Sequence, residues 1–364
     1  MARQVSVNDI QVAIFLALQV EVNAMDRMLD ERVTINPNQD ILSPWARAHI
    51  SNKCIPGRIG DIYVVLVPLP RMGTEPAASA ATTCRHIFPR VELALVVGVC
   101  GAVPSYRGRD GTNRAIGLGD VVISEGFEQY NLGSSTPEGF QRKGGPLYGL
   151  PQPNQELRSF IAKLRTPREV AEVQEQIADG RTICRYKKGR FAGDSTTATA
   201  TTAKIPWHQF IGRSFAHVQS GYRSAEAAIH FGLVASGNTV IKHAGYRDNL
   251  AKEIGAIAFE MEGAGVCTVF EGTTLIIKAV CDYADAHKAK EWQPRAALTA
   301  AICVKSILTS HWSPTRLIPR RGLKAYCTAS NASEYAGIIG YLEDTTDPTF
   351  KKVSFPDLYN PSHC

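Results

Sequence analysis

The chain has 364 residues, 44% of them hydrophobic and 20% charged, a composition typical of a soluble globular protein with a large core. The net charge of +6 is a mild excess, and the basic run at residues 186–190 is short, so we expect a solvated basic surface and no nucleic-acid partner. The apolar run at residues 12–18 is too short to span a bilayer, so we expect no membrane association.

The first part of the chain alternates between apolar runs of strand length and segments with helical spacing. Helical spacing over residues 21–31 predicts a helix after the first strand. The Ala-rich stretch 77–84 predicts a second helix, with Thr74 as its N-terminal cap. The apolar runs predict strands at residues 12–18, 62–67, 93–99 and 121–124.

From Gly139 to about Ser220 the sequence becomes polar and irregular, although helical spacing recurs at residues 155–164 and 169–177. We expect this segment, 139–220, to be an insertion over the core of a single domain that covers residues 8–310. Residues 311–364 are rich in Pro, Ser, Thr and Tyr with weak periodicity, which predicts an irregular C-terminal extension.

Regular patterns return after the insertion. Apolar runs predict strands at residues 231–235, 256–259 and 274–280. Helical spacing predicts a helix at 261–270 and a closing helix at 295–308, with Pro294 in its first turn. Buried strands that alternate with helices predict an α/β fold, with a mostly parallel central sheet in a three-layer α/β/α arrangement.

Four carboxylates follow the predicted strands, where ligands bind in such folds. They are Glu21, Glu260, Glu262 and Asp282. Because an unpaired buried charge is costly, carboxylates at these positions are either paired or used in chemistry. Taken singly, Glu262 is also explained as a helix cap and Asp282 as a turn residue.

The nine cysteines are spread along the chain and form no Cys-x-x-Cys pair. Several lie in apolar runs, and the N-terminus lacks the pattern of a secretory signal, so we expect reduced, buried thiols and a cytoplasmic location. Because the histidines and cysteines occur without the spacing of metal ligands, we expect neither a metal site nor a cofactor.

Several collinear segments resemble the nucleoside phosphorylase / methylthioadenosine (S-adenosylhomocysteine) nucleosidase superfamily. The resemblance runs in order from about Ile10 to Leu308, and the segments that carry it are 96–103, 119–124, 259–265 and 280–285. Segments 235–238 and 240–242, and 282–288 followed by Trp292 and Gln293, resemble its fungal branch, in which such domains are often fused to NACHT, ankyrin or TPR modules. The resemblance implies a phosphorylase/hydrolase-like fold and a homo-oligomer.

The resemblance also implies a division of labour among the carboxylates. Asp282 matches the acid that assists the leaving purine, and Glu21 matches the carboxylate that activates water. Glu262 matches the carboxylate that holds the ribose hydroxyls, and Met261 matches the side chain under the ribose. These roles suit cleavage through an oxocarbenium-like transition state.

The remaining expected contacts concern the base and the 5′ substituent. Purine contacts are expected from Cys100, Gly101, Val240 and Ile241, whose apolar faces and backbone groups suit a flat heterocycle. Candidates for a phosphate or 5′-group contact are Arg71, Arg223 and His230. Alternatively, Arg71 faces solvent and His230 has a structural role.

The function predicted in this way is hydrolysis of the N-glycosidic bond of a purine (adenine-type) nucleoside or nucleotide, a small-molecule substrate. Phosphorolytic relatives carry an arginine shortly after the first strand, whereas residues 19–24 contain none, and Glu21 places negative charge there. Three alternatives stay open: a phosphate-dependent phosphorylase, the same fold recruited to another reaction in secondary metabolism, and a non-catalytic sensor module.

Overall fold

A computed structural model describes residues 3–36, 42–137, 139–144, 148–187, 227–287 and 290–314 of the chain. The chain divides into two units, residues 1–314 and 315–364, and the described residues all belong to the first. None of the helices in these ranges combines the length and the apolar character that a membrane span needs.

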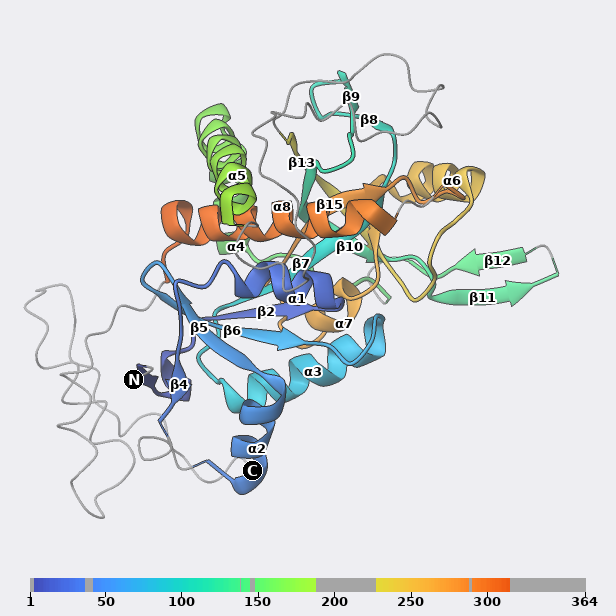
Figure 1. Cartoon of the computed structure of the whole chain (residues 1–364). Coiled ribbons are helices and arrows are strands. Elements are labelled where there is room, and N and C mark those ends of the chain that lie inside the picture. Colours follow the sequence, from blue (N-terminus) through green and yellow to red (C-terminus); the bar gives the residue numbers. More distant parts are fainter. Residues whose placement is uncertain are drawn as a thin grey trace, which may run out of the picture. The chain divides into compact units, whose positions relative to one another are not determined.

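Nine of the described strands form one mixed sheet (Figure 1). Its order is β14 (Ala256–Glu260), β13 (Ile229–Ser236), β10 (Val121–Gln129), β15 (Thr274–Asp282), β7 (Leu93–Ala102), β2 (Val12–Leu16), β6 (Ile62–Pro68), β5 (Ile55–Ile59) and β3 (Glu31–Arg32). Neighbours from β15 to β6 are parallel, as are β10, β13 and β14. Strand β14 also pairs with β7, so the five strands from β14 to β7 close on themselves.

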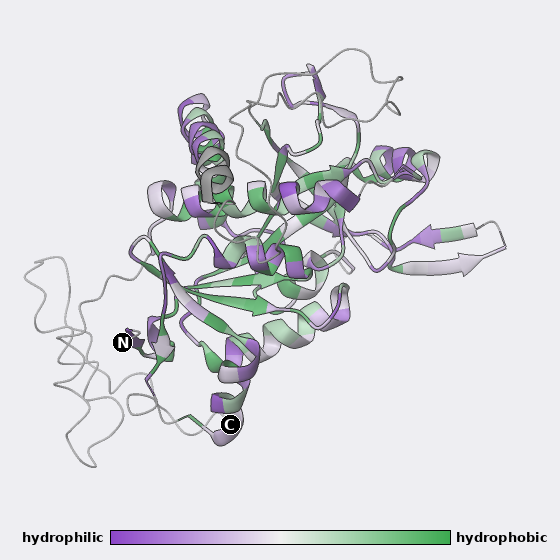
Figure 2. Ribbon diagram, in the orientation of Figure 1, coloured by the Kyte–Doolittle hydropathy of each residue, from purple (hydrophilic) through white to green (hydrophobic). Residues whose placement is uncertain are grey.

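Alternation along the strands divides the core between the two faces of the sheet. In β2, Ala13 and Phe15 join one hydrophobic cluster, while Val12, Ile14 and Leu16 join the other. The first cluster takes in side chains from α2 (Pro44–Lys53), α3 (Thr74–Ile87) and α7 (Gly263–Cys267). The second takes in α1 (Gln19–Asp26), α4 (Gln155–Leu164), α5 (Pro167–Lys187) and α8 (Gln293–Ser306). Figure 2 shows the hydrophobic residues gathered along the sheet between these helices, which confirms the three-layer α/β/α prediction.

Smaller elements decorate this core. Strand β1 (Gln4–Val5) pairs with β4 (Thr34–Ile35), β8 (Ser105–Arg107) with β9 (Asn113–Ala115), and β11 (Gly133–Thr136) with β12 (Gly139–Arg142). Helix α6 (Ala244–Ile254) precedes β14, and short helical turns occupy Val7–Asp9, Lys290–Trp292 and Ile307–His311.

The observed elements differ from the predicted ones mainly at their ends. Thr74 is the first residue of α3 rather than its cap, and the N-cap is Gly73, whose φ of 121° favours glycine. The helix predicted at 261–270 is the shorter α7, because the carboxylate of Glu260 closes the turn before it. Helices α2 and α6 were not predicted.

The segment predicted as an insertion contains regular structure. Helix α4 has the predicted bounds, and Val173 and Ile177 of α5 lie in the core beside α8. Residues 188–220 of the predicted insertion lie outside the described residues, and so does almost all of the C-terminal extension. The domain limits therefore stay a prediction.

Candidate active site

A cavity of about 510 Å³ lies where the strands of the sheet end. Most of its walls come from residues at or just after the C-terminal ends of β2, β7, β10, β13, β14 and β15, the edge at which α/β sheets bind ligands. All eight residues predicted to catalyse or to bind ribose and base line this cavity: Glu21, Cys100, Gly101, Val240, Ile241, Met261, Glu262 and Asp282.

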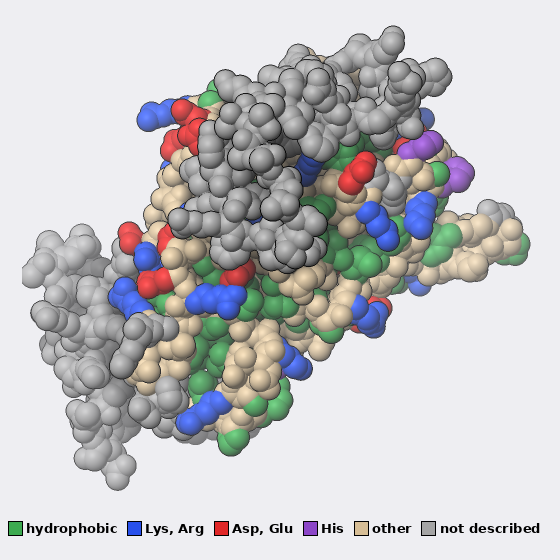
Figure 3. Space-filling view, in the orientation of Figure 1, with side chains coloured by type: hydrophobic (Ala, Val, Ile, Leu, Met, Phe, Trp, Pro, Cys, Tyr) green, Lys and Arg blue, Asp and Glu red, His purple; other side chains and the backbone are tan. Residues whose placement is uncertain are grey.

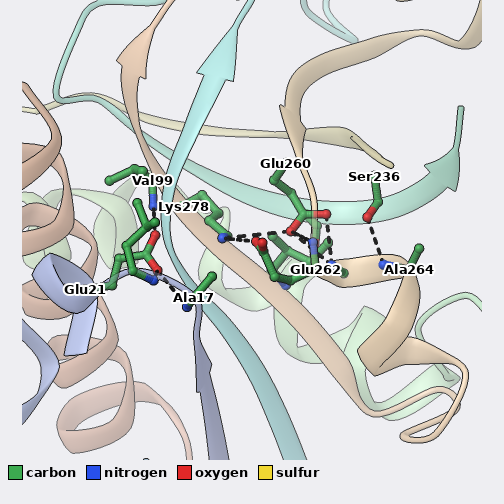
Figure 4. Close-up of polar contacts among 12 residues, drawn as sticks. Ala17, Glu21, Val99, Ser236, Glu260, Glu262, Ala264 and Lys278 are labelled. Atoms are coloured by element: carbon green, nitrogen blue, oxygen red, sulfur yellow. Dashed lines mark hydrogen bonds and ion pairs between the residues drawn. The ribbon is translucent and has the colours of Figure 1, made fainter. Parts of the chain in front are cut away.

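Glu21 is fixed in the cavity by backbone donors from two strand ends. Its Oε2 accepts the N–H groups of Ala17 at 2.9 Å and Leu18 at 2.8 Å, which also caps α1, and its Oε1 accepts the N–H of Val99 at 2.8 Å (Figure 4). This close approach requires glycine at position 98, because a Cβ there would lie 1.9 Å from Glu21 Oε1 and φ is +149°. The carboxylate is therefore held rigidly against β7.

Glu260 and Glu262 stand side by side in sequence but differ in their partners. The carboxylate of Glu260 accepts the N–H groups of Glu262 and Gly263 at 3.0 Å, so it shapes the turn from β14 into α7. Glu262 Oε2 instead accepts a hydrogen bond from Lys278 Nζ at 2.9 Å, and its Oε1 lies 3.4 Å from the N–H of Gly73. Glu260 is a structural residue, whereas Glu262 keeps hydrogen-bonding capacity for a ligand.

Lys278, which the sequence analysis did not identify, lies in the middle of this acidic group (Figure 4). It is 2% exposed, and its Nζ lies 2.9 Å from Glu262 Oε2 and 3.9 Å from Glu260 Oε2. Burial alone would lower the pKa of Lys278, but the carboxylates of Glu262, Glu21 and Glu260 outweigh it and raise that pKa well above its usual value. The ammonium group therefore stays charged.

Three carboxylates against one ammonium group leave an excess of negative charge in a buried space. Burial raises the pKa of Glu21, and the negative charge of Glu262 raises it further, although Lys278 and the backbone donors oppose the shift. Burial likewise raises the pKa of Glu260. Glu21 and Glu260 thus hold protons at pH values at which exposed carboxyls have lost theirs.

Asp282 lies at the end of β15, where the register with β7 shifts between Val280 and Asp282. Its Oδ1 accepts the N–H of Ala284 at 2.8 Å, and Cys281 Sγ lies 3.4 Å from its Oδ2. Ala284 itself has a positive φ of 52°, so the loop turns sharply behind the carboxylate.

Two contacts hold the loop after Asp282 in place. The hydroxyl of Tyr283 donates to the carbonyl of Ile116 at 3.1 Å, and Arg247 of α6 donates from Nη1 to the carbonyl of Tyr283 at 2.5 Å. Because Arg247 is 5% exposed, α6 and this loop are joined by a buried contact.

The apolar wall and the opening of the cavity have different characters. Ile241 is buried, whereas Val240 is 42% exposed and Met72 is 44% exposed. We call the exposed lining residues Met72, Thr239, Val240, Lys242, Ala286 and Lys290 the mouth, and the buried residues Glu21, Glu260, Glu262 and Lys278 the floor. Further lining residues that the sequence analysis did not single out include Tyr130, Phe259 and Gln293.

Two of the three candidates for a 5′-group contact, Arg71 and His230, do not line the cavity. Arg71 is exposed, next to Met72 of the mouth. His230 is buried with Nε2 2.9 Å from Asp120 Oδ2 and Nδ1 3.3 Å from the Tyr106 hydroxyl, so both ring nitrogens have protein partners. Arg223 lies outside the described residues.

Among the described residues, one group has the composition of a metal site. Glu169 and Glu172 of α5 and His311 after α8 bring their ligand atoms within 4.8 Å of one another. None of the three lines the cavity, and the Nδ1 of His311 already contacts Glu169 Oε2 at 2.6 Å. The contact between Glu169 and His311 joins α5 to the segment after α8, and the group lies outside the cavity lining.

Comparison with known proteins identifies the family to which the chain belongs. The family model described as the phosphorylase superfamily matches residues 12–309. A nucleotide-binding leucine-rich repeat (NLR)-like protein from the fungus Hyaloscypha variabilis is 34% identical over 281 residues, which are 73% of this chain but 26% of that protein. The chain thus spans about a quarter of the length of that relative.

Solved structures share the fold at low sequence identity. The 5′-methylthioadenosine/S-adenosylhomocysteine nucleosidase of Neisseria meningitidis, in complex with methylthio-immucillin-A, is 18% identical with a TM-score of 0.50. The MTA/SAH nucleosidase of Streptococcus pneumoniae, in complex with 8-aminoadenine, is 17% identical with a TM-score of 0.50. In both cases the match covers 82% of this chain and 99% of the other.

Proposed function

Because the chain belongs to the phosphorylase superfamily, we propose that its cavity hydrolyses the N-glycosidic bond of a purine (adenine-type) nucleoside or nucleotide. The observation that carries the proposal is that Glu21, Glu262 and Asp282, which come from three distant parts of the sequence, line one cavity at the strand ends. The solved relatives with nucleoside-like and adenine-like ligands support a small molecule of this class.

Glu21 activates the attacking water in this proposal. Its carboxylate is fixed by three backbone N–H groups, and its raised pKa brings it closer to neutral pH, where a base is most effective. A water that donates to this carboxylate loses its proton to Glu21 as its oxygen bonds to the anomeric carbon.

Asp282 assists the departure of the base. As the C–N bond breaks, the electron pair moves onto the purine, and a proton or hydrogen bond from Asp282 spares the leaving group a full negative charge. The turn held by Ala284 and by the Arg247–Tyr283 contact keeps this carboxyl at the cavity wall.

Glu262 and Met261 hold the sugar. The Glu262 carboxylate accepts hydrogen bonds from the ribose hydroxyls, and its charge stabilises the positive charge that develops on the ribosyl ring. Lys278 acts through Glu262: its ammonium group donates to that carboxylate at 2.9 Å and orients it. Cys100, Gly101, Val240 and Ile241 form the wall against which the base lies.

The charge of the floor favours water over phosphate as the nucleophile. Three carboxylates surround the only buried cation of the described lining, Lys278, and no arginine belongs to that lining. An incoming phosphate would be repelled by the net negative charge of the floor, and the low dielectric constant of a buried site strengthens that repulsion. A phosphate-dependent phosphorylase is the second candidate, because it shares the family and the fold.

One experiment separates these functions. The full chain is incubated with adenosine, inosine, methylthioadenosine, AMP and ATP, with and without inorganic phosphate, and base release is followed by chromatography. We expect adenine release in phosphate-free buffer. Release that depends on phosphate would identify a phosphorylase. No release from any of these compounds would overturn the proposal and favour the recruited fold or the sensor module.

The assembly and the location expected from the sequence also stay proposals. A homo-oligomer is checked by light scattering of the full chain, and a cytoplasmic location by imaging a tagged protein. Fusion to further modules is compatible with the length of the Hyaloscypha relative, of which this chain matches 26%.

A further inference from the structure

Two segments that are distant in the sequence line the mouth of the cavity. Met72 lies just before α3, and Thr239 and Val240 follow β13. In the described sheet β6, which leads into α3, is not a neighbour of β13, so no strand pairing ties the two segments together. Met72 and Val240 are exposed, and Figure 3 shows hydrophobic side chains at the surface on the side of the molecule where α6 lies. Burial of these side chains therefore does little to fix one segment against the other.

The side chain of Asn238 joins the two segments. Its Oδ1 accepts the N–H of Thr74 at 2.8 Å, and its Nδ2 donates to Thr74 Oγ1 at 2.7 Å and to Glu75 Oε1 at 3.1 Å. Thr74 is the first residue of α3, so its N–H is one of the backbone donors that a helix leaves unpaired. Because the N-cap Gly73 has no side chain to accept it, Asn238 supplies the acceptor from 164 residues away. We call these three hydrogen bonds the clasp.

On the side of α3, the clasp adjoins a backbone donor that meets the Glu262 carboxylate. The N–H of Gly73 lies 3.4 Å from Glu262 Oε1. The amide of Asn238 packs against the same glycine, since a Cβ at Gly73 would lie 3.0 Å from Asn238 Oδ1. Without the clasp the start of α3 is free to shift, and the N–H that meets Glu262 shifts with it.

On the other side, the loop after β13 is anchored to its neighbours. The N–H of Gly237 donates to the carbonyl of Glu260 at 3.1 Å, and the hydroxyl of Tyr130 donates to the carbonyl of Thr239. The wall expected to hold the base, residues 240–241, follows directly. The clasp therefore connects an anchored base wall to the part of the cavity that holds the sugar in the proposed function.

We propose that Asn238 is a positioning residue for the reaction: through the clasp it sets the distance between the Glu262 carboxylate and the base wall. The sugar and the base of one substrate are thereby held in the geometry for cleavage. This inference rests on the proposed function, because it uses the same cavity. A misplacement of about 1 Å can cost about 10²-fold in rate. Because the clasp lies at the surface, water replaces its hydrogen bonds in a variant, so its loss should cost little stability.

The test uses one ligand that spans both sides of the clasp and one that reaches only the base wall. Adenosine has sugar and base, whereas adenine lacks the sugar. We compare kcat/KM for adenosine and the inhibition constant of adenine in wild type, Asn238→Ala, Thr74→Val and the double variant. Asn113→Ala is the matched control, because it removes an exposed asparagine of β9 that lies outside the cavity lining.

The expected result is a selective loss for the spanning ligand. In Asn238→Ala, kcat/KM for adenosine should fall about tenfold or more, while the inhibition constant of adenine stays within about twofold and Tm within about 3 °C. Thr74→Val loses the hydroxyl but keeps its N–H, so its effect should be smaller. In the double variant it should add nothing, because its partner is already gone. Thr74→Ser keeps the hydroxyl and should match wild type, as should the control.

Three outcomes would overturn the positioning role. One is an unchanged kcat/KM for adenosine in Asn238→Ala. Another is an equal loss for adenosine and adenine, which would mean that the base wall itself is damaged. The third is additive losses from Asn238→Ala and Thr74→Val in the double variant, since side chains that act through one contact cannot lose it twice.

Binding measurements keep this test separate from that of the reaction. If wild type cleaves no compound, the hydrolase proposal fails, and calorimetric titration with adenosine and with adenine replaces the kinetics. Adenosine affinity that falls about tenfold in Asn238→Ala, with adenine affinity unchanged, supports the positioning role. A fall in both affinities or in neither contradicts it, and so does the absence of adenosine binding by wild type.

Discussion

Two polar clusters of the molecule differ in how their charges are balanced. In the cluster of Asp120, His230 and Tyr106, one carboxylate accepts from the N–H of Gly117 at 2.7 Å, the N–H of Ala228 at 2.9 Å and the ring of His230 at 2.9 Å. The carboxylate of Asp120 and both ring nitrogens of His230 are thus hydrogen-bonded within the protein, and the cluster does not line the cavity. It ties the starts of β10 and β13 together.

The floor of the cavity is the opposite case. It sets three carboxylates against Lys278, and all four side chains line an open space. A histidine with both nitrogens satisfied therefore indicates a structural role, whereas unbalanced charge that faces a cavity indicates a site with hydrogen-bonding capacity left for a ligand. Four predictions test this distinction.

The largest effect is expected at Asp282. An Asp282→Asn change keeps the shape of the side chain but removes the proton donor, so base release should fall by about 10²–10⁴-fold. Steady-state kinetics measure the fall, and thermal unfolding checks that the protein is intact. The same change at exposed Asp61, between β5 and β6 and outside the cavity, serves as a control that should retain activity. Full activity of Asp282→Asn would remove this residue from the mechanism.

Lys278 comes next, because it acts on both stability and activity. Replacement by Met leaves buried carboxylates without their cation, which costs about 3–5 kcal/mol of unfolding free energy. Denaturant titration measures this cost. Lys278→Arg retains the charge, so it should recover most of the stability and part of the activity. If Met and Arg behave alike, the charge of Lys278 does not hold the floor together.

The third prediction concerns the pH dependence of base release. The ionised form of Glu21 is the active base, and burial raises its pKa, so activity should be lost as pH falls through a value above the ordinary ~4.3 of a glutamate. The ammonium group of Lys278 opposes that rise. In Lys278→Gln the acid limb of the kcat profile should therefore move to higher pH. A purely structural lysine would leave the limb where it is.

Much of the site could be predicted because its residues follow strands. Each predicted strand is an apolar run that is followed by a carboxylate or a glycine. Because parallel strands end at the same edge of the sheet, these residues come together there. Glu21, Gly101, Glu262 and Asp282, which follow predicted strands and lie in the family motifs, all line one cavity. It also gave the layers of the fold, since buried strands and amphipathic helices differ in period.

Other parts of the site depend on distances that no local pattern contains. Lys278 lies inside a strand, and only the pairing of β15 with β7 shows that its side chain meets Glu262. The lysine in an otherwise apolar run was the available signal. Lys242 was not singled out because α6 was not predicted, so the N-terminal end of that helix was not expected beside the site.

The smallest effect on activity is expected from a change at His230, which tests whether the Asp120–His230–Tyr106 cluster is purely structural. Its partners lie 110 and 124 residues away in the sequence, so the sequence alone offered both a ligand contact and a structural role. Replacement by Phe leaves Asp120 with its two backbone donors but removes the bond to the ring, which should cost about 1–3 kcal/mol of unfolding free energy. Because neither Asp120 nor Tyr106 lines the cavity, kcat/KM of the folded protein should stay within about threefold of wild type. If kcat/KM fell by two orders of magnitude in a fully stable variant, the Asp120–His230–Tyr106 cluster would also serve the reaction. Charge balance would then not distinguish a structural cluster from a functional one.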